Sequence, residues 1–262
     1  MIKRCLRHAL PLLCLMLLPL AAVADDTCRR LTATGNPEYP PYLWRDPRNP
    51  QQLMGANADL LKHLGKQLGL EIDVVYAGPW SRAQEEVRTG RIDLLAGYFR
   101  TEARQQHMDF IEPPFLATPS VVWVRQGDAF AYRQWADLKG RKGGTLVNNS
   151  HGQQFDEYAQ AHLTLEAVPT ARQAFEKLVH KRSAYVVYEQ YPGMALARTL
   201  GIGGAVQVLQ PPVSSEGLYL AISHNSPCNQ PQLRAALARE MARIVGGAMP
   251  QQLLKQNMEQ WQ

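Results

Sequence analysis

The chain has 262 residues, of which 28 are Lys or Arg and 23 are Asp or Glu, giving a formal net charge of +5 at pH 7. Hydrophobic residues make up 45% of the chain, enough to fill the core of one domain or of two small ones. Beyond residue 24, basic residues cluster no further than the pairs Arg29-Arg30 and Lys181-Arg182, so nucleic acid is excluded as an expected partner.

The first 24 residues have the three parts of a secretory signal peptide. Lys3, Arg4 and Arg7 precede an apolar run over 9–20, and a small-x-small cleavage pattern follows at 22–24. We therefore expect residues 1–24 to be removed and the mature chain, from residue 25, to be a soluble periplasmic protein. Loss of the three basic residues lowers the formal net charge from +5 to +2.

The predicted mature chain keeps two of the four cysteines, Cys28 and Cys228. In an oxidising compartment a pair of cysteines most simply forms a disulfide. Metal ligation and catalysis are the less favoured alternatives, because no histidine cluster accompanies either cysteine.

The first half of the mature chain alternates between strand and helix patterns. Strands are expected at 30–34, 71–76 and 91–96, and helices at 58–68 and 81–89. The proline-rich stretch 36–42 is expected to be irregular. Strand–helix–strand alternation of this kind is typical of a parallel, doubly wound sheet.

The second half repeats this alternation. Strands are expected at 120–125, 143–147, 164–168, 183–188 and 217–223, and helices at 152–162, 170–181, 192–200, 232–245 and 250–260. The sequence thus predicts an α/β protein of two doubly wound lobes joined by two crossover segments. Lobe 1 is expected to comprise 25–118 plus 217–262, with both cysteines, and lobe 2 to comprise 119–216.

The most informative segment is 90–104. An apolar strand is broken by Gly97, the aromatic residues Tyr98 and Phe99 follow, and Thr101 begins a short helix that carries Arg104. This order brings a guanidinium to the carboxyl end of a strand, where open α/β sheets bind ligands. A planar five-donor group beside aromatic rings suits a ligand with a carboxylate. The alternative is an ion pair with Glu102 or Asp109 on a solvated face.

Five segments in order resemble family 3 of the periplasmic solute-binding proteins, the type II, two-lobed binding components of polar amino acid ABC importers. They are residues 60–70 (LLKHLGKQLGL), 90–94 (GRIDL), 101–104 (TEAR), 109–115 (DFIEPPF) and 246–261. The resemblance covers essentially the whole mature chain.

The resemblance assigns roles to four residues of lobe 1. It implies that Arg104 binds the ligand's α-carboxylate and that Tyr39 packs over the ligand. Asn36 matches a polar residue that contacts ligand side chains. Trp80 matches an apolar wall position, although a core residue at the start of a helix is an alternative for it.

The sequence departs from the family at two segments that contribute to the ligand site. Tyr98 and Phe99 stand where the family often has small polar residues. In lobe 2, Asn-Asn-Ser-His-Gly at 148–152 replaces the family's Gly-Ser/Thr-Thr segment. Ser150 is therefore either an anion-binding group at a helix start or a plain N-cap. His151 is either a ligand contact or a solvated loop residue.

The third departure follows the strand at 183–188. Amino-acid binders of the family place an Asp there that pairs with the α-ammonium, whereas this chain has Tyr188 followed by Glu189. Either Glu189 takes over that role with a shifted register, or the ligand is not an ordinary α-amino acid. An exposed Glu189 at a helix start is the third alternative.

The resemblance implies a monomeric periplasmic protein that captures a small carboxylate-bearing solute by cleft closure and presents it to the permease of an ABC importer. One alternative is a sensory binding protein that reports to a membrane receptor or signalling enzyme. Another is an exported enzyme similar to cyclohexadienyl dehydratases, with Glu189 as general acid. We expect no enzyme activity, cofactor or metal, because the sequence has no Ser-His-Asp order, metal-ligand spacing or Gly-rich phosphate loop.

Overall fold

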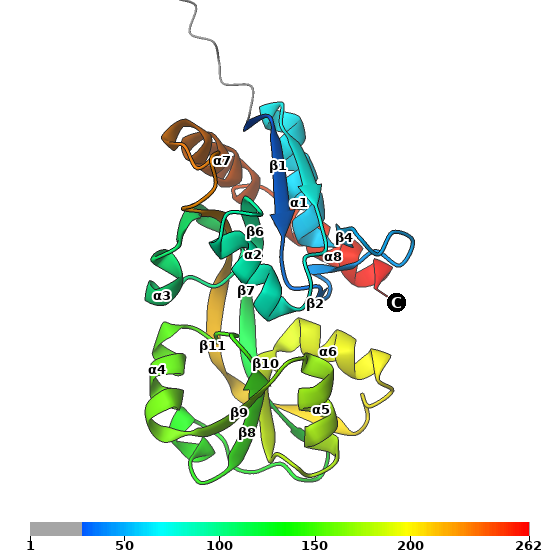
Figure 1. Cartoon of the computed structure of the whole chain (residues 1–262). Coiled ribbons are helices and arrows are strands. Elements are labelled where there is room, and N and C mark those ends of the chain that lie inside the picture. Colours follow the sequence, from blue (N-terminus) through cyan, green and yellow to red (C-terminus); the bar gives the residue numbers. More distant parts are fainter. Residues whose placement is uncertain (1–27, 262) are drawn as a thin grey trace, which may run out of the picture.

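The computed structural model describes residues 28–261 as an α/β protein of two lobes (Figure 1). The predicted signal peptide lies outside the described residues. One eight-stranded sheet runs through both lobes in the order β5-β1-β6-β11-β7-β10-β8-β9, and a three-stranded sheet, β2-β3-β4, lies beside it. The predicted fold class is confirmed.

The first lobe begins with strands and helices close to the predicted positions and with three short strands, at 38–39, 43–45 and 53–54, that were not predicted. They are β1 (Arg30–Thr34), β2 (Glu38–Tyr39), β3 (Leu43–Arg45), β4 (Leu53–Met54), α1 (Ala56–Leu68), β5 (Glu71–Val74), α2 (Trp80–Arg88), β6 (Leu94–Tyr98) and α3 (Glu102–Gln105). Strand β1 pairs in parallel with β5 and β6. The α1 leucines Leu60, Leu61 and Leu64 are buried, and Gly69 ends the helix in the left-handed conformation with φ 67°.

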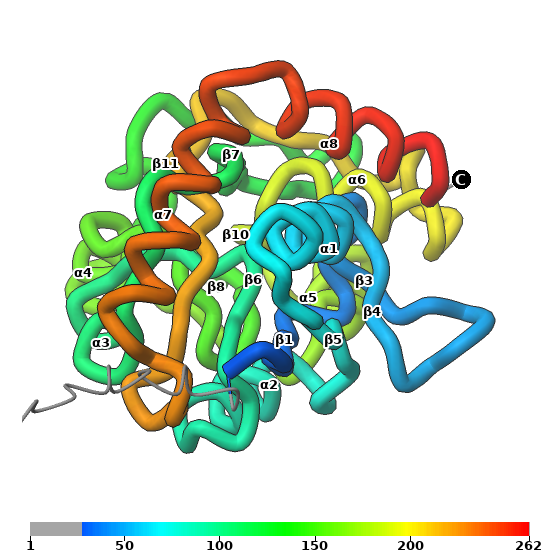
Figure 2. Tube along the Cα trace, turned by 90° about the horizontal axis from the view of Figure 1, so that it is seen from above, coloured from blue at the N-terminus to red at the C-terminus, as the bar shows by residue number. Residues whose placement is uncertain are grey.

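The second lobe follows the same strand–helix alternation. Its elements are the 3₁₀ helix η2 (Trp135–Leu138), β8 (Lys142–Leu146), α4 (Gln153–His162), β9 (Thr164–Val168), α5 (Ala171–Val179), β10 (Tyr185–Glu189) and α6 (Gln190–Thr199). Strand β8 pairs in parallel with β9 and β10. The chain then returns to the first lobe and ends in α7 (Pro231–Val245) and α8 (Met249–Gln260), which lie on the side of that lobe near α1 (Figure 2).

Two long antiparallel strands connect the lobes. They are β7 (Met108–Arg125) and β11 (Val206–Ser223), and each contributes to the sheet of both lobes (Figure 1). Their register shifts twice, between Leu209 and Ser214 and again between Leu218 and Leu220. The lobe limits expected at 118 and 217 fall inside these two strands.

The stretch 36–42, expected to be irregular, contains the two-residue strand β2. Glu38 pairs with Trp44 and Tyr39 pairs with Leu43 in a short antiparallel hairpin. The prolines at 40 and 41 come directly after this strand, so they remove no hydrogen bond from its ladder. The prediction for this segment was therefore wrong in part.

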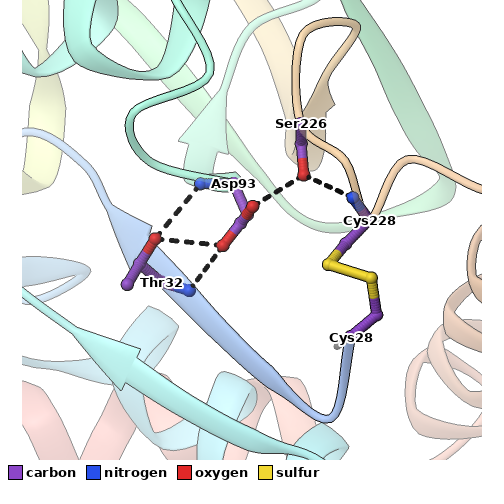
Figure 3. Close-up of a disulfide and its surroundings, with 5 residues drawn as sticks. All are labelled: Cys28, Thr32, Asp93, Ser226 and Cys228. Carbon is purple, nitrogen blue, oxygen red and sulfur yellow. Dashed lines mark hydrogen bonds between the residues drawn. A yellow bond between two sulfur atoms is a disulfide. The ribbon is translucent and has the colours of Figure 1, made fainter. Parts of the chain in front are cut away.

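A disulfide joins Cys28 to Cys228, which is 200 positions away, as expected (Figure 3). Asp93 makes a second connection at the same place. Its Oδ2 accepts hydrogen bonds from the Thr32 backbone N–H at 2.8 Å and hydroxyl at 3.0 Å, and its Oδ1 accepts one from the Ser226 hydroxyl at 2.6 Å. Both connections attach the beginning of the fold to the segment that follows β11. Within residues 28–261, no helix is both long and apolar enough to span a membrane.

Candidate ligand site between the lobes

Arg104 lies where the lobes meet, one turn into α3. The Thr101 hydroxyl caps this helix by accepting a hydrogen bond from the Arg104 backbone N–H at 3.3 Å. The guanidinium lies 4.0 Å from the centre of the Tyr98 ring. Its Nη1 donates to the Phe99 carbonyl at 2.9 Å, and its Nη2 donates across the cleft to the Asn148 carbonyl at 3.3 Å. The strand–turn–helix segment thus turns this side chain toward the second lobe.

The alternative of a surface ion pair for Arg104 is wrong. Within residues 28–261 the guanidinium forms no ion pair with Glu102 or Asp109, and Asp109 instead lies 3.4 Å from the Arg234 guanidinium. Burial lowers the pKa of Arg104, an effect that the nearby carboxyl groups of Asp156 and Glu189 oppose. Its charge is therefore only partly compensated by the protein.

A small cavity between the lobes contains Arg104 in its wall. Its volume, about 10 Å³, is close to the least that holds one water molecule. The lining residues come from both lobes: Asn36, Tyr39, Trp80, Gly97, Phe99, Arg104, Asn149 and Glu189. Six of the ten residues predicted to bind the ligand lie in this wall.

Three of these residues form the wall on the first lobe with little room to move. The Asn36 side chain accepts a hydrogen bond from the Glu38 backbone N–H at 3.0 Å, which fixes the turn before β2. Tyr39 packs on Tyr42 with ring centres 5.1 Å apart. Trp80, the first residue of α2, is only 6% exposed, and its Nε1 has no hydrogen-bond partner within the described chain.

Glu189 faces the cavity from the second lobe at the end of β10. It is 2% exposed, so the alternative of an exposed residue at a helix start is wrong. Asn149 donates a hydrogen bond to its Oε1 at 3.3 Å, whereas Oε2 has no partner within the described chain. Burial raises the pKa of this carboxyl to about 7, although the Asn149 hydrogen bond and the Arg104 charge act in the opposite direction.

Tyr188 does not line the cavity. Successive residues of a strand point to opposite faces, and Tyr188 lies on the face opposite to Glu189, where it packs edge-on against Phe175 with ring centres 6.1 Å apart. Its hydroxyl donates to the Glu38 carbonyl of the first lobe at 3.2 Å. Tyr188 therefore contacts the opposite lobe but not the cavity.

Ser150 and His151, both predicted to bind the ligand, also lie outside the cavity wall. The Ser150 hydroxyl donates to Asp156 and accepts from the Gly152 backbone N–H at 3.1 Å. Helix α4 has Gly152 as its N-cap and no side-chain cap, so the N-cap alternative for Ser150 is wrong. His151 is 2% exposed and its Nε2 lies 2.8 Å from the Thr145 hydroxyl, so the solvated alternative is wrong too. Burial lowers the pKa of His151 to about 3.

A wider pocket of about 520 Å³ opens on the other side of Arg104. It lies between α2 and α3 on one side and α4 on the other, and its wall includes Tyr98, Ser150 and Asp156. Arg104 lines both this pocket and the small cavity. Its guanidinium is therefore within reach of a ligand in either space.

Sequence reasoning missed three residues that shape the site, of which Gln84 joins the two lobes and Asn149 and Asp156 make contacts within the second lobe. Gln84 donates to the Asn148 carbonyl at 3.2 Å and accepts from the Tyr98 hydroxyl at 2.8 Å. Asn149 is the hydrogen-bond donor to Glu189, and Asp156 fixes the turn at Ser150. The signal available for Asn149 was its place in the segment that departs from the family pattern. Gln84 and Asp156 carry no motif. No cluster of three or more His, Cys, Asp or Glu residues suited to a metal occurs between residues 28 and 261.

Comparison with known proteins gives consistent results. The family model for bacterial extracellular solute-binding proteins, family 3, matches residues 31–260. A histidine kinase sensor domain with similarity to periplasmic binding proteins superposes with a TM-score of 0.73 and 22% identity, covering 88% of this chain and 96% of that one. No curated protein matches by sequence.

Two binding proteins have nearly the same structural similarity. A mutant of ArgBP from T. maritima gives a TM-score of 0.72 at 18% identity, over 88% of this chain and 95% of that chain. AbpA from Streptococcus pneumoniae, an amino acid ABC transporter substrate-binding protein bound to L-arginine, gives 0.71 at 16% identity over the same shares of the two chains. At sequence identities this low, the structural similarity establishes a shared fold and nothing about the ligand.

Proposed function

Because the chain belongs to family 3 of the bacterial extracellular solute-binding proteins, we propose that it binds a small solute with a carboxylate, an amino acid or a similar compound, between its lobes. The observation that carries the proposal is the placement of Arg104 and Glu189 in the wall of one cavity, from opposite lobes. A guanidinium on one side and a carboxyl on the other are complementary to a zwitterion.

In this proposal Arg104 binds the carboxylate and Glu189 binds the ammonium group of the ligand. Tyr39, Phe99 and Trp80 supply the apolar surface around it. Glu189 takes the role that the family gives to an Asp at the position of Tyr188, because the alternation along β10 directs Glu189 and not Tyr188 to the cavity. The ligand is then an α-amino acid or a close analogue.

We propose that the ligand enters an open form and that the lobes close over it, with the crossing parts of β7 and β11 as hinges. The lobes would be 25–118 plus 217–262 and 119–216. Burial of a charged ligand is favourable only if its charges are paired, and the two lobes each offer one of the two partners. Closure therefore depends on a ligand that reaches both Arg104 and Glu189.

The role that we favour is the supply of solute, by a periplasmic monomer, to the permease of an ABC importer. The naming of AbpA as an ABC transporter substrate-binding protein supports it. A sensory role, in which the closed form is recognised by a membrane receptor, is the second candidate. The similarity to a histidine kinase sensor domain favours that candidate.

An enzyme that acts on a carboxylated ring is the third candidate. A carboxyl whose pKa burial raises to about 7, as in Glu189, suits general acid catalysis at neutral pH. Binding without turnover is our proposal, because the solved structures of similar fold are named for binding or sensing. Turnover of a cyclohexadienyl acid by the purified protein would contradict it.

The proposal is tested by a thermal-shift screen of the twenty L-amino acids, their derivatives and small carboxylates against the wild-type protein, Arg104→Ala and Arg100→Ala. Arg100 is a matched control because it is an exposed arginine of the same segment that pairs with Glu112. A ligand at a hundred times its Kd stabilises the native state by about 2.7 kcal/mol. We expect a shift in the wild type and in Arg100→Ala and none in Arg104→Ala. An undiminished shift in Arg104→Ala would contradict the proposal.

A further inference from the structure

A row of three polar side chains crosses the sheet beside the cavity. Glu189 of β10 is directly opposite Ser120 of β7, and Ser120 is in turn directly opposite Ser214 of β11. Strand β7 is antiparallel to both β10 and β11. Directly opposed residues of antiparallel strands point to the same face, with Cβ atoms about 5 Å apart. The three side chains therefore lie next to one another.

Each member of this row has a buried oxygen without a hydrogen-bond partner within residues 28–261. These atoms are Glu189 Oε2, Ser120 Oγ and Ser214 Oγ. Ser120 is completely buried and Glu189 is 2% exposed. Buried polar atoms in folded proteins are nearly always hydrogen-bonded, so three unpaired oxygens in adjacent positions indicate a shared arrangement.

The row lies at the boundary between the ligand cavity and the core of the second lobe. Two residues further into that lobe, on the same face, are the fully buried Val122 and Val187. These side chains offer no hydrogen-bonding group, so on this side the partners of the three oxygens come from the row itself or from a water among them. On the other side of the row, Thr118 of β7 is also completely buried and its hydroxyl has no partner within residues 28–261. A serine hydroxyl donates one hydrogen bond and also accepts, whereas an ionised carboxylate only accepts.

We propose that Ser120 and Ser214 are positioning residues of the ligand site, whose hydroxyl groups form a hydrogen-bonded chain, bridged by water, that ends on Glu189 Oε2. Through these bridges Ser214 donates toward Ser120 and Ser120 donates toward Glu189. With Asn149 on Oε1, the carboxylate is held by one group on each oxygen and faces the cavity. The inference rests on the proposed function only in giving Glu189 a ligand to hold.

The two serines also connect the ligand site to the strands that join the lobes. Ser120 and Ser214 belong to these two strands, and Ser214 is the residue at which their register resumes after the first shift. The group that holds the ligand's ammonium is thereby connected to the proposed hinge. A change in the conformation of β7 or β11 where they cross between the lobes would therefore shift the Glu189 carboxyl group.

The charged and ionisable groups around Glu189 determine how strongly the two hydroxyl groups have to stabilise its ionised form. Arg104 of α3, Asp156 of α4, Tyr39 of β2 and Tyr42, which directly precedes β3, interact with it from the other elements, and Tyr188 does so from its own strand. Burial of Glu189 favours the neutral acid and raises its pKa, whereas a ligand's ammonium group requires the carboxylate. Hydrogen bonds donated to a carboxylate favour the ionised form, so removal of Ser120 Oγ should raise the pKa of Glu189 further.

The test is a carbon-13 NMR titration of the Glu189 side-chain carboxyl without any added amino acid, with the resonance assigned by comparison with Glu189→Gln. We would titrate the wild type, Ser120→Ala, Ser214→Ala, Ser120→Thr and Ser183→Ala. Ser183 is the matched control, because it is also a buried serine of the second lobe with an unpartnered hydroxyl but precedes β10 at its far end.

We expect the midpoint to rise by about 0.5 pH unit or more in Ser120→Ala, to rise less in Ser214→Ala, and to stay unchanged in Ser183→Ala. Ser120→Thr keeps the hydroxyl and should restore the wild-type midpoint. Unchanged midpoints in both Ser120→Ala and Ser214→Ala would overturn the proposal. If Ser120→Ala failed to fold, Ser214→Ala alone would decide. Since no ligand is present, this result is independent of the outcome of the Arg104 screen.

Discussion

The Tyr188 hydroxyl donates a hydrogen bond to the backbone carbonyl of Glu38, 3.2 Å away across the cleft and 150 positions away in the chain. Tyr188 is the next-to-last residue of β10 in the second lobe. Glu38 belongs to the short β2–β3 hairpin of the first lobe, which also contains Tyr39. The bond is therefore made only when the lobes are together. It strengthens the closed form without contacting the cavity.

Tyr188→Phe should weaken ligand binding without unfolding the protein. The substitution keeps the ring against Phe175 and removes one hydrogen bond, which contributes about 0.5–1.5 kcal/mol, or a two- to tenfold loss of affinity. Isothermal titration calorimetry with the amino acid that gives the largest thermal shift would measure it. Tyr185→Phe is the control, because the Tyr185 hydroxyl is buried inside the second lobe without a partner in the described chain. Equal affinities of the two variants would contradict this role for Tyr188.

Glu189→Gln should change how stability depends on pH. Burial raises the pKa of Glu189 from 4.5 to about 7, so between these values the folded protein holds a proton that the unfolded chain has lost. Wild-type stability should therefore fall as pH rises through this window, by at most about 3 kcal/mol relative to Glu189→Gln, and level off above it. Urea unfolding of both proteins at pH 5 and pH 8 measures the difference. If the difference in unfolding free energy between the two proteins were the same at pH 5 and pH 8, the predicted effect of burial on Glu189 would be contradicted.

His151 should remain neutral well below the pH at which histidines usually take up a proton. Burial lowers its pKa from 6.5 to about 3, so the unfolded chain binds a proton that the folded protein does not. Folding should lose about 1.4 kcal/mol per pH unit below 6.5 from this residue, opposite in sign to the effect of Glu189. The NMR signals of its ring, assigned with His151→Gln, should not shift between pH 8 and pH 5. A midpoint near 6.5 would show that the ring is solvated.

Removal of the disulfide should lower stability and leave the ligand site intact. Cys28 and Cys228 close a loop of 200 residues, for which the chain-entropy treatment gives about 5 kcal/mol. Cys28→Ser combined with Cys228→Ser should unfold at a lower urea concentration than the wild type but bind the same amino acid with the same Kd. Reductant should shift the wild type toward the double variant and leave the variant unaffected, which serves as the control.

The regular elements could be predicted where apolar residues follow one clear period. The helix expected at 58–68 is α1 (Ala56–Leu68), and the strand expected at 164–168 is β9 (Thr164–Val168). In α1 the buried residues recur at helical spacing and Gly69 ends the helix, whereas β9 has no buried residue and is marked by its apolar and β-branched composition, with Thr164 as its first residue. For the other helices and strands with a clear apolar period, the predicted ends differ from the observed ends by a few residues.

The long strands were predicted only in part, because prolines interrupt their pattern. Expected at 120–125 and 217–223, they in fact begin at Met108 and Val206. The prolines at 113 and 114 lie in the register shift between the pairs of β7 and β11 at Ile111 and Leu116, and those at 211 and 212 lie in the register shift between Leu209 and Ser214, so none of the four occupies a paired position. The proline at 119 lies where β7 pairs with β11 alone, since β10 pairs with β7 only from Ser120 onward. An edge strand tolerates proline because one side of it needs no N–H donor.

Six of the eight residues that line the cavity were predicted from the sequence, but their arrangement was not. The strand–turn–helix segment and the family pattern indicated Arg104, and the structure places it in the cavity wall. Sequence could not decide between Tyr188 and Glu189, because adjacent strand residues face opposite sides and a shift of one residue exchanges them. The pairing of β10 with β7 settles which side chain faces the cavity. The buried state of His151 likewise depends on the packing of α4, which lies outside the local pattern.

The sharing of β7 and β11 between the lobes also dictates an order of assembly. A chain delivered from its N-terminus completes the second lobe with the first part of β11, whereas β6 lacks its neighbour on one side until residues 219–222, in the last part of β11, arrive. The second lobe, contiguous in sequence, is free to fold first, whereas the first lobe waits for β11, α7 and α8, and the disulfide waits for Cys228. Truncation near the C-terminus would therefore damage the lobe that is made first.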